Sequence, residues 1–384
     1  MKLLFVSNLF PDEAQPWRGL DNSTLLHHLA DHWEIRVLAI RSTLPWQRLT
    51  WRPRTADAAL QPRYLPSLYV PKFGSRWNHR LMAGALRTPM REIRREFAFD
   101  VVLGSWIFPD CCALAELSPE LAFPFVAIAQ GSDVHQYLRV PARRRIILDR
   151  LPRARAVVTR SGELARLLIE AGLPAERTRP IYNGIDFACF KPGDSLAARR
   201  ELGLPENGRV ILFVGNFYDI KNPGLLVEAH ARLCADPDLS DCRLVLIGGG
   251  PLADALQQNA AHLGTSDRVV FVGRKDAPAV ARYMQAADVL ALPSRNEGVP
   301  NVILEAFACG LPVVASRIGG IPEVHNAAEL GRLFAEGNLD ALTEALRSVL
   351  QTPPARDRIC AHAQQFSWER TTTAYDKLLR QAVS

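Results

Sequence analysis

Short apolar runs alternate with longer segments of helical periodicity along the whole chain. Five such runs lie in the first half: KLLFVSN (2–8), EIRVLAI (34–40), DVVLGSW (100–106), FVAIAQG (125–131) and AVVTRS (156–161). Five more lie in the second half: VILFVGN (210–216), RLVLIGGG (243–250), RVVFVGR (268–274), DVLALPS (288–294) and PVVASR (312–317). Runs this short are typical of strands buried on both faces, with helices as their connections. The pattern predicts an α/β protein with two doubly wound parallel sheets.

The turn-rich segment PIYNGIDFACFKPGD (180–194) precedes a new strand and indicates a domain boundary. We therefore expect an N-terminal domain over 1–182 and a C-terminal domain over 183–365. The final segment, 366–384, has apolar residues at helical spacing and predicts a terminal helix that could pack on either domain.

Composition is that of a globular protein, with 48% hydrophobic residues in a chain of 384. The N-terminal apolar run is too short for a signal peptide, and no stretch reaches the ~18 apolar residues of a membrane span. We expect a cytoplasmic location. Seven cysteines without a C-x-x-C pair indicate small core residues, and no convincing metal-binding motif is present.

Positive charge is concentrated in the first half of the chain. Residues 1–180 hold 26 lysines and arginines against 17 acidic residues, whereas the remainder holds 20 against 23. The arginines cluster in RTPMREIRREF (87–97) and RVPARRRIILDRLPRAR (139–155). Such clusters suit an anionic membrane surface, or they form a solvated, salt-bridged face. Without a zinc-finger or RNP1-like motif, we expect no nucleic-acid partner.

The segment NEGVPNVILEAFACGLPVVAS (296–316) carries the strongest chemical signal. Glu297 falls in the loop after a strand, and Glu305 falls in a helix that starts near Pro300 and stops at Gly310. Their backbones are roughly 10 to 12 Å apart along the helix axis. The two carboxylates of a glycoside hydrolase lie about 5 to 9.5 Å apart. Glu297 and Glu305 therefore fit better as contacts to two parts of one long ligand. A solvated loop charge and a surface helix charge are the alternative.

The start of this helix favours phosphate binding. Backbone N–H groups around Gly298, Val299, Asn301 and Val302 have few intrahelical partners and lie at the positive end of the helix dipole. A sugar hydroxyl at Glu297, phosphates over the helix start and ribose hydroxyls at Glu305 would together match a nucleotide-sugar.

Other candidate residues follow predicted strands. Gly215, Asn216 and Lys221 follow one strand, and the lysine could neutralise a diphosphate, although a lone lysine is commonly a surface charge. GGGPLA (248–253) formally matches a dinucleotide fingerprint, but Arg274 stands where the acidic residue belongs. We expect this loop, including Gly249, to approach a ligand closely.

Two further candidates lie in the first half of the chain. Asp133, in AIAQGSDVH (127–135), either reaches across a cleft or caps the next helix. The long loop after the first strand contains Arg18 and Gly19, and loops of such length are commonly functional.

Taken together, these motifs resemble the family-4 retaining glycosyltransferases. The resemblance covers most of the chain and rests on the Gly19 loop, GSDV, NGID, VGNFYDIKN, GGGP, FVGR, GGIPE, FSWE and, above all, the E-x7-E element with its A-x-G-x-P-V-V-A-S continuation. It implies the GT-B fold, with two Rossmann-like domains facing a central cleft. The N-terminal domain would bind the acceptor, the C-terminal domain would bind the nucleotide-sugar, and the terminal helix would cross back to the N-terminal domain.

The resemblance also implies roles for the candidate residues. Glu305 would hold the donor's ribose, Glu297 its sugar, and Lys221 its diphosphate, while Gly19 would let the first loop approach the reaction centre and Asp133 would line the sugar side. The predicted set comprises catalytic Glu297, Lys221 and Asp133, and substrate-binding Gly19, Gly215, Asn216, Gly249, Arg274, Gly298, Val299, Pro300, Asn301 and Glu305.

This chain departs from the family pattern at two positions. Asn216 stands where the family commonly has arginine, and Gln130 where it often has histidine. The first departure leaves the phosphate clamp one charge short, unless Arg274 or Arg18 compensates.

The expected activity is retaining, metal-independent sugar transfer to a lipid-linked or saccharide acceptor in glycan or polysaccharide synthesis. No cofactor beyond the nucleotide-sugar donor is expected, and an anionic membrane surface is the expected partner of the basic half. A nucleotide-sugar epimerase of the same fold and a non-catalytic partner in a glycan pathway are the alternatives.

Overall fold

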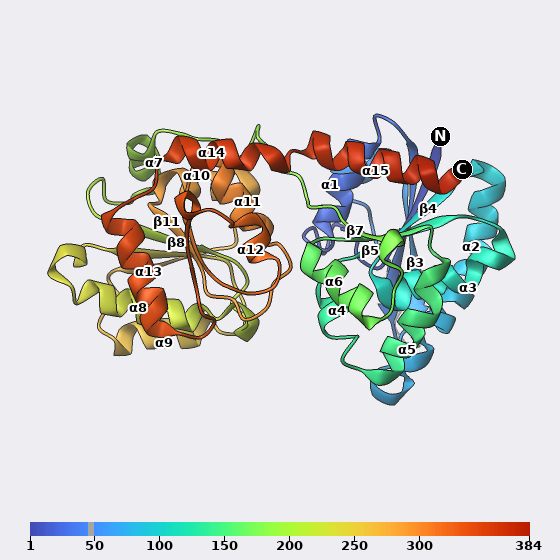
Figure 1. The fold of residues 1–384 in the computed structure, drawn as a ribbon, viewed down its shortest axis with the longest axis horizontal. Coiled ribbons are helices and arrows are strands. Elements are labelled where there is room, and N and C mark those ends of the chain that lie inside the picture. The colour runs from blue at the N-terminus through green and yellow to red at the C-terminus, as the bar shows by residue number, and fades with distance from the viewer. Residues whose placement is uncertain (45–49) are drawn as a thin grey trace. The chain divides into compact units, whose positions relative to one another are not determined.

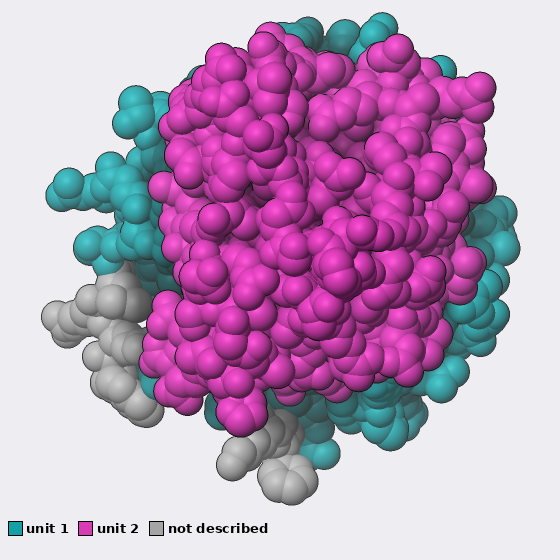
Figure 2. Space-filling model, turned by 90° about the vertical axis from the view of Figure 1, so that its left-hand side faces the viewer, with its two compact units in different colours: residues 1–183, 368–384 teal, residues 184–367 magenta. Residues whose placement is uncertain are grey.

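The computed structural model of the protein describes residues 1–44 and 50–384. The chain divides into two compact units, which are coloured separately in Figure 2. Unit 1 comprises Met1–Asn183 together with Trp368–Ser384, and unit 2 comprises Gly184–Ser367. Unit 1 is thus built from two segments that lie far apart in the sequence.

Unit 1 contains a seven-stranded parallel sheet in the order β3-β2-β1-β4-β5-β6-β7 (Figure 1). Its strands are β1 (Lys2–Ser7), β2 (Glu34–Thr43), β3 (Pro62–Leu68), β4 (Val101–Ser105), β5 (Phe125–Ala129), β6 (Ala156–Thr159) and β7 (Thr178–Pro180). All five strands expected in this half are present. The pattern did not reveal the two edge strands, since β3 contains two prolines and β7 has three residues.

Helices cover both faces of this sheet. They are α1 (Leu20–Leu29), α2 (Asn78–Phe97), α3 (Cys112–Leu121), α4 (Ser132–His135), α5 (Pro141–Arg150), α6 (Gly162–Ala171) and α15 (Trp368–Val383). Leu4 and Val6 pack with α2, α3, α5 and α6, whereas Leu3 and Phe5 pack with α1 and α15. Because alternate residues serve two cores, the strands read as continuous apolar runs.

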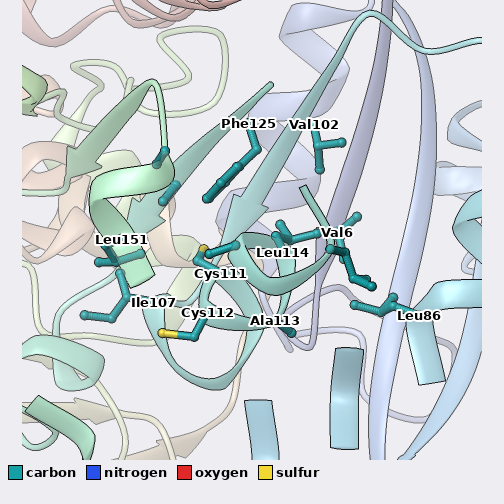
Figure 3. Close-up of a cluster of buried hydrophobic side chains, with 14 of the residues drawn as sticks. Val6, Leu86, Val102, Ile107, Cys111, Cys112, Ala113, Leu114, Phe125 and Leu151 are labelled. Atoms are coloured by element: carbon teal, nitrogen blue, oxygen red, sulfur yellow. The ribbon is translucent and has the colours of Figure 1, made fainter. Parts of the chain in front are cut away.

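The cysteines of α3 belong to the first of these cores. Figure 3 shows Cys111 and Cys112 among Val6, Leu114 and Phe125, and both are fully buried. Burial raises the pKa of the Cys112 thiol to above its ordinary range. The seven cysteines are all free thiols, and those on α3 are the small core residues that the sequence indicates.

Unit 2 contains a six-stranded parallel sheet in the order β10-β9-β8-β11-β12-β13. Its strands are β8 (Val210–Val214), β9 (Arg243–Ile247), β10 (Val269–Gly273), β11 (Val289–Leu292), β12 (Val313–Ser316) and β13 (Gly331–Phe334). Its helices are α7 (Ser195–Leu202), α8 (Pro223–Cys234), α9 (Ala253–His262), α10 (Ala277–Ala286), α11 (Asn301–Ala308), α12 (Ile321–Val324), α13 (Leu339–Gln351) and α14 (Arg356–Ala363). The sheet lies between α8, α9 and α13 on one side and α10, α11 and α12 on the other (Figure 1). The prediction of two doubly wound parallel sheets is confirmed, with β13 as a further edge strand.

Each sheet has a point where the strand order reverses direction. This point lies between β1 and β4 in unit 1 and between β8 and β11 in unit 2. Open α/β sheets bind ligands outside the carboxyl ends of the strands at such a point. The loops after these four strands are therefore the first places to look for a site.

The two arginine clusters have different surroundings. On α2, Arg87 and Arg91 both bond to Glu120, which makes this cluster the salt-bridged face that the sequence left open. On α5, Arg144 and Arg145 are exposed. Over residues 1–44 and 50–384, no helix combines the length and the apolar character that a membrane span requires.

Candidate functional site

Lys221 and Glu297 meet at the strand-order reversal of unit 2. Lys221 ends a short 3-10 turn (Asp219–Lys221) beyond β8, and Glu297 lies in the loop after β11. Lys221 Nζ lies 2.5 Å from Glu297 Oε1, which also accepts a 2.7 Å hydrogen bond from Ser294 Oγ. The Glu297 side chain is 9% exposed and the Lys221 side chain 26%, so ligand can reach the lysine more easily. An ammonium has three N–H groups, and two of them remain for ligand oxygens.

Backbone contacts fix the loop that carries Glu297. Arg295 N donates to Ile220 O at 2.8 Å, which ties this loop to the Lys221 turn. Gly320 N donates to Gly298 O at 3.0 Å, which holds the other side of the loop. Ser294, which sequence reasoning missed, is fully buried and orients the carboxylate. The pair is thus preorganised by elements of the same unit.

Helix α11 starts directly after this loop. Pro300 has an extended ψ of 125° and is the N-cap residue before the first helical residue, Asn301, so the expected helix start near Pro300 is confirmed. Ile303 N donates to Pro300 O at 3.1 Å, and the amides of Asn301 and Val302 belong to the first turn. The expected stop at Gly310 is confirmed by its φ of 70° and by the bond from Leu311 N to Ala306 O.

Glu305 is half-buried on α11. Burial raises the pKa of the Cys189 thiol, and the charges of Asp186 and Glu305 add to this shift, so Glu305 lies near the segment that precedes α7. Glu297 and Glu305 therefore stand in different surroundings: Glu297 is paired with Lys221, and Glu305 is half-buried on α11. Their arrangement is not that of a carboxylate pair sharing one bond.

The glycine loop after β9 packs against the loop after β8. A Cβ on Gly248 would lie 1.8 Å from Gly215 O, and Phe217 N donates to Gly249 O at 3.0 Å. Gly248 thus lies against the protein's own backbone at Gly215, and the approach of this loop to a ligand stays a prediction. Arg274 follows β10, and its side chain runs over Gly249, with Nε 3.7 Å from the position of a Cβ there. The fold therefore brings Gly215, exposed Asn216, Gly249 and Arg274 together.

Gly19 lies at the start of α1 in unit 1. Its φ is 65°, and a Cβ would lie 2.3 Å from the carbonyl carbon and oxygen of Leu9. Asn22 Nδ2 donates to Leu9 O at 2.8 Å, and Arg18 Nε donates to Asn8 O at 2.9 Å. Glycine is required where this loop folds back onto the end of β1.

Asp133 is fully buried beside the end of β5. Its Oδ1 accepts from the amides of Gln130 and Gly131 at 2.9 and 2.8 Å, and its Oδ2 accepts from Ile107 N at 2.8 Å. Burial raises the pKa of Asp133, and these three donors oppose the shift. Asp133 lies inside the first turn of α4, whose N-cap is Gly131 without a side-chain hydrogen bond, so the alternative that Asp133 caps the next helix is wrong. Its carboxylate instead accepts from the backbone of the preceding loop and of Ile107. Direct contact between Asp133 and a substrate stays a prediction.

Gln130 links four elements of unit 1. Its Nε2 donates to Asn22 Oδ1 at 2.8 Å and to Ser105 Oγ at 2.7 Å, and its Oε1 accepts from Arg160 Nε at 3.4 Å. Arg160 in turn donates to the hydroxyl of Tyr375 on α15 at 3.2 Å. The Gln130 amide therefore connects α1, the end of β4 and the segment after β6 at the carboxyl ends of the strands.

Asp110 is a buried carboxylate that sequence reasoning missed. It accepts hydrogen bonds from the backbone and side-chain amides of Asn8, at 2.5 and 2.9 Å. Burial raises the pKa of Asp110 to about 7, against the opposing effect of the Asn8 donors. No sequence motif marked it, because its chemistry depends on two loops that meet only in the fold.

The described residues, 1–44 and 50–384, contain no group of three or more His, Cys, Asp and Glu side chains that could hold a metal ion. The predicted site residues fall into two groups. Unit 2 contains Lys221, Glu297, Glu305, Gly215, Asn216, Gly249, Arg274, Gly298, Val299, Pro300 and Asn301, whereas unit 1 contains Gly19 and Asp133. Within unit 2, Glu297 and the start of α11 lie on the same loop, and Lys221 reaches Glu297 from the turn after β8.

Two family models match the chain. The model described as "Glycosyl transferases group 1" matches residues 194–366, and the model described as "Glycosyltransferase Family 4" matches residues 22–188. A similar relative is the D-inositol 3-phosphate glycosyltransferase of Saccharomonospora viridis, 33% identical over 269 residues, which cover 67% of this chain and 62% of that protein. The chain thus spans about three fifths of the length of this relative.

Solved structures share the fold over nearly the whole chain. Sucrose-phosphate synthase from Thermosynechococcus elongatus aligns with a TM-score of 0.80 at 22% identity, covering 99% of both chains. Anabaena HepE in complex with UDP aligns with a TM-score of 0.79 at 20% identity, covering 99% of this chain and 100% of that one. HepE has also been solved with UDP-glucose. These likenesses establish the GT-B fold.

Proposed function

The chain belongs to the family 4, group 1 glycosyltransferases, and on that premise we propose that it is a retaining, metal-independent hexosyltransferase. The donor would be a nucleotide-diphosphate-sugar, and the acceptor a lipid-linked or saccharide molecule of cell-surface glycan or polysaccharide synthesis. The observation that carries the proposal is the Lys221–Glu297 pair, 2.5 Å apart at the strand-order reversal of unit 2 and next to the start of α11.

Departure of the diphosphate is the step that this site would assist. Breaking the anomeric bond builds negative charge on the departing nucleotide, so fixed donors around the phosphates stabilise the transition state most. The Lys221 ammonium and the first-turn amides of α11 are such donors. Attack by the acceptor on the departing face would keep the anomeric configuration.

The carboxylates would hold the two ends of the donor. Glu297 would accept hydrogen bonds from the transferred sugar while Lys221 contacts the neighbouring phosphate, which is consistent with their separation of 2.5 Å. Glu305, further along α11, would accept from the ribose hydroxyls. UDP-sugars are the first donors to test, because HepE binds UDP and UDP-glucose.

Arg274 is the best candidate to replace the charge missing at Asn216. It belongs to the same unit and runs over Gly249, next to the loop of Gly215 and Asn216. Arg18 is less suited, because it belongs to unit 1 and already donates to Asn8 and Gln15. We therefore assign the second phosphate contact to Arg274.

The basic surface of α5 would meet an anionic membrane that carries a lipid-linked acceptor. Arg144 and Arg145 line a pocket of about 610 Å³ together with Pro141, Leu148 and Asp149. Arginines beside apolar side chains suit lipid headgroups at an interface. The enzyme would then bind the cytoplasmic face of the membrane peripherally.

The test is donor consumption by the purified full-length protein. UDP-, GDP- and ADP-sugars are screened by thermal shift, and the stabilising donor is then incubated with candidate acceptors while nucleotide release and sugar products are followed. We expect nucleotide release, a product of retained configuration, and loss of both in Glu297→Gln, with Glu329→Gln as the exposed control. A free epimer without acceptor would favour the epimerase, and donor binding without any turnover would favour a non-catalytic partner.

A further inference from the structure

The residue that follows β4 has a strained backbone. Trp106 has a φ of 78° and a ψ of 104°, a region that non-glycine residues rarely enter. Such a conformation is unfavourable and persists only where neighbouring groups impose it. Because β4 borders the strand-order reversal of unit 1, Trp106 stands where ligands of such sheets bind.

Three hydrogen bonds impose this conformation. Trp106 N donates to Ile128 O at 2.9 Å, Cys111 N donates to Trp106 O at 3.1 Å, and Ile107 N donates to Asp133 Oδ2 at 2.8 Å. The next two residues, Ile107 and Phe108, are buried, whereas Trp106 is only half-buried. The strain therefore keeps one large aromatic side chain out of the core.

A second aromatic ring lies beside the indole. The rings of Trp106 and Tyr137 have centroids 6.1 Å apart at an interplanar angle of 87°, and buried Phe108 supports Tyr137 at 5.9 Å. The Arg143 guanidinium lies 4.4 Å from the Tyr137 ring centroid. Tyr137 and Arg143 are both half-buried. Two aromatic rings and one cation thus lie side by side.

The positive charge of Arg143 is not neutralised by a neighbour. In the part of the chain that the structure describes, no carboxylate lies within ion-pair distance of Arg143, and its Nε is buried without a hydrogen-bond partner. The one acidic residue of α5, Asp149, pairs with Arg150. Arg144 and Arg145, next along the helix, are exposed and add further positive charge. An arginine stacked on a ring and lacking an anion is well suited to receive one.

We propose that Trp106, Tyr137 and Arg143 form an acceptor subsite for an anionic sugar, with the ring against the aromatic surfaces and its phosphate or carboxylate on the Arg143 guanidinium. The assignment of this ligand as acceptor rests on the proposed function. Asp133 is the positioning residue of this subsite, because its bond to Ile107 holds the strained Trp106 backbone.

The test measures binding of small sugars to the full-length protein by calorimetry and saturation-transfer NMR. Glucose, glucose 6-phosphate, glucuronic acid and inorganic phosphate are the probes. We expect both anionic sugars to bind at least 10-fold more tightly than glucose and than phosphate alone. Arg143→Gln should abolish this preference and leave the weak binding of glucose unchanged. Tyr137→Ala should lower the affinity for all three sugars.

Arg155→Gln is the control, because it removes an exposed arginine of the same unit that belongs to no proposed site. Equal binding of glucose and the anionic sugars, or a preference that survives Arg143→Gln, would overturn the inference. Equal losses in Arg143→Gln and Arg155→Gln would show general charge attraction and would also overturn it. Thermal unfolding of each variant identifies misfolding, and Arg143→Lys serves as a second variant that keeps charge but loses the planar stack.

Donor turnover separates this inference from the proposed function. Arg143-dependent binding of anionic sugars without consumption of any nucleotide-sugar would contradict the proposed sugar transfer and leave the subsite standing. Consumption of a donor by a protein that binds anionic sugars no better than glucose would contradict the subsite and leave the proposed sugar transfer standing.

Discussion

Lys221 Nζ lies 2.5 Å from Glu297 Oε1, although the two residues are 76 positions apart in the sequence. The contact places a cation and a carboxylate side by side. On the proposed function the cation would bind phosphate and the carboxylate would accept from sugar hydroxyls, so the anomeric bond would lie next to both. A change in either residue leaves the other without its partner, and the predictions for unit 2 follow from this dependence.

We expect Lys221→Ala to lower turnover at least 10-fold and to leave the fold intact. The ionic contact to the departing diphosphate strengthens in the transition state, so its loss affects kcat more than donor affinity. Steady-state kinetics with the identified donor measure this, and Lys275→Ala, an exposed lysine of the same unit, is the control. An unchanged kcat would remove Lys221 from the phosphate clamp.

We expect Glu305→Gln to raise the donor KM about 10-fold with a smaller change in kcat. A hydrogen bond to a charged group contributes about 1.5 to 3 kcal/mol, and a ribose contact remote from the reacting bond acts equally on ground and transition states. Donor KM and kcat are compared with those of Glu329→Gln, which removes an exposed charge. A fall confined to kcat would contradict the ribose assignment.

Asp133→Asn should destabilise unit 1 and weaken acceptor binding. One side-chain carbonyl must then replace two carboxylate oxygens that accept three backbone amides, and leaving a buried donor unpaired costs about 1 to 3 kcal/mol. Thermal unfolding should show a lower Tm, and kinetics should show a higher acceptor KM with an unchanged donor KM. Asp149→Asn, an exposed carboxylate of the same unit, should do neither. A lower Tm with an unchanged acceptor KM would limit Asp133 to stability.

Asp110 should make the folded state less stable as pH rises. Its pKa is about 7 when folded and 3.8 ordinarily, so between about pH 4 and pH 7 the unfolded chain releases a proton that the folded chain retains. The penalty is absent below pH 4 and complete above pH 7. Urea unfolding at pH 5 and pH 8 should show wild type losing about 1 kcal/mol or more relative to Asp110→Asn. If the unfolding free energies of wild type and Asp110→Asn changed equally with pH, the raised pKa of Asp110 would be contradicted.

Binding to vesicles that contain anionic lipid should depend on salt and on α5. Each arginine near such a surface contributes about 1 kcal/mol, so Arg144→Gln combined with Arg145→Gln should lower the bound fraction several-fold in sedimentation. Arg87→Gln on α2 should have little effect, because Arg87 already pairs with Glu120. Binding that ignores ionic strength or the α5 pair would contradict the membrane surface.

The central strands and the donor loop could be predicted because their signals are local. The strand ending at Leu292, the helix containing Glu305 and the stop at Gly310 are each encoded within a few neighbouring residues. The edge strands β3, β7 and β13 were missed because they are short or interrupted by proline, and edge strands need less apolar sequence.

The remaining parts of the site depend on contacts between distant segments. Ser294 beneath Glu297, the raised pKa of Asp110 beside Asn8 and the strained Trp106 held through Asp133 have no sequence pattern of their own. The Gly248 loop is a further case: its glycines were recognised, but the contacts of Gly248 with the Gly215 backbone and of Gly250 with the Phe217 backbone appear only in the fold. The sequence indicated candidate site residues and conformationally required glycines, and the fold determined which residues they contact.

Tyr375 on α15 is fully buried in the core shared by α1 and the unit 1 sheet, and Trp33 donates to Asp376 on the same helix at 2.8 Å. A ribosome completes residues 1–183 long before it reaches this helix. The part of the sheet face that α15 covers therefore stays exposed until unit 2 has been synthesised. A fragment ending at Asn183 should accordingly aggregate or recruit chaperones, and a separately supplied peptide of residues 368–384 should rescue it.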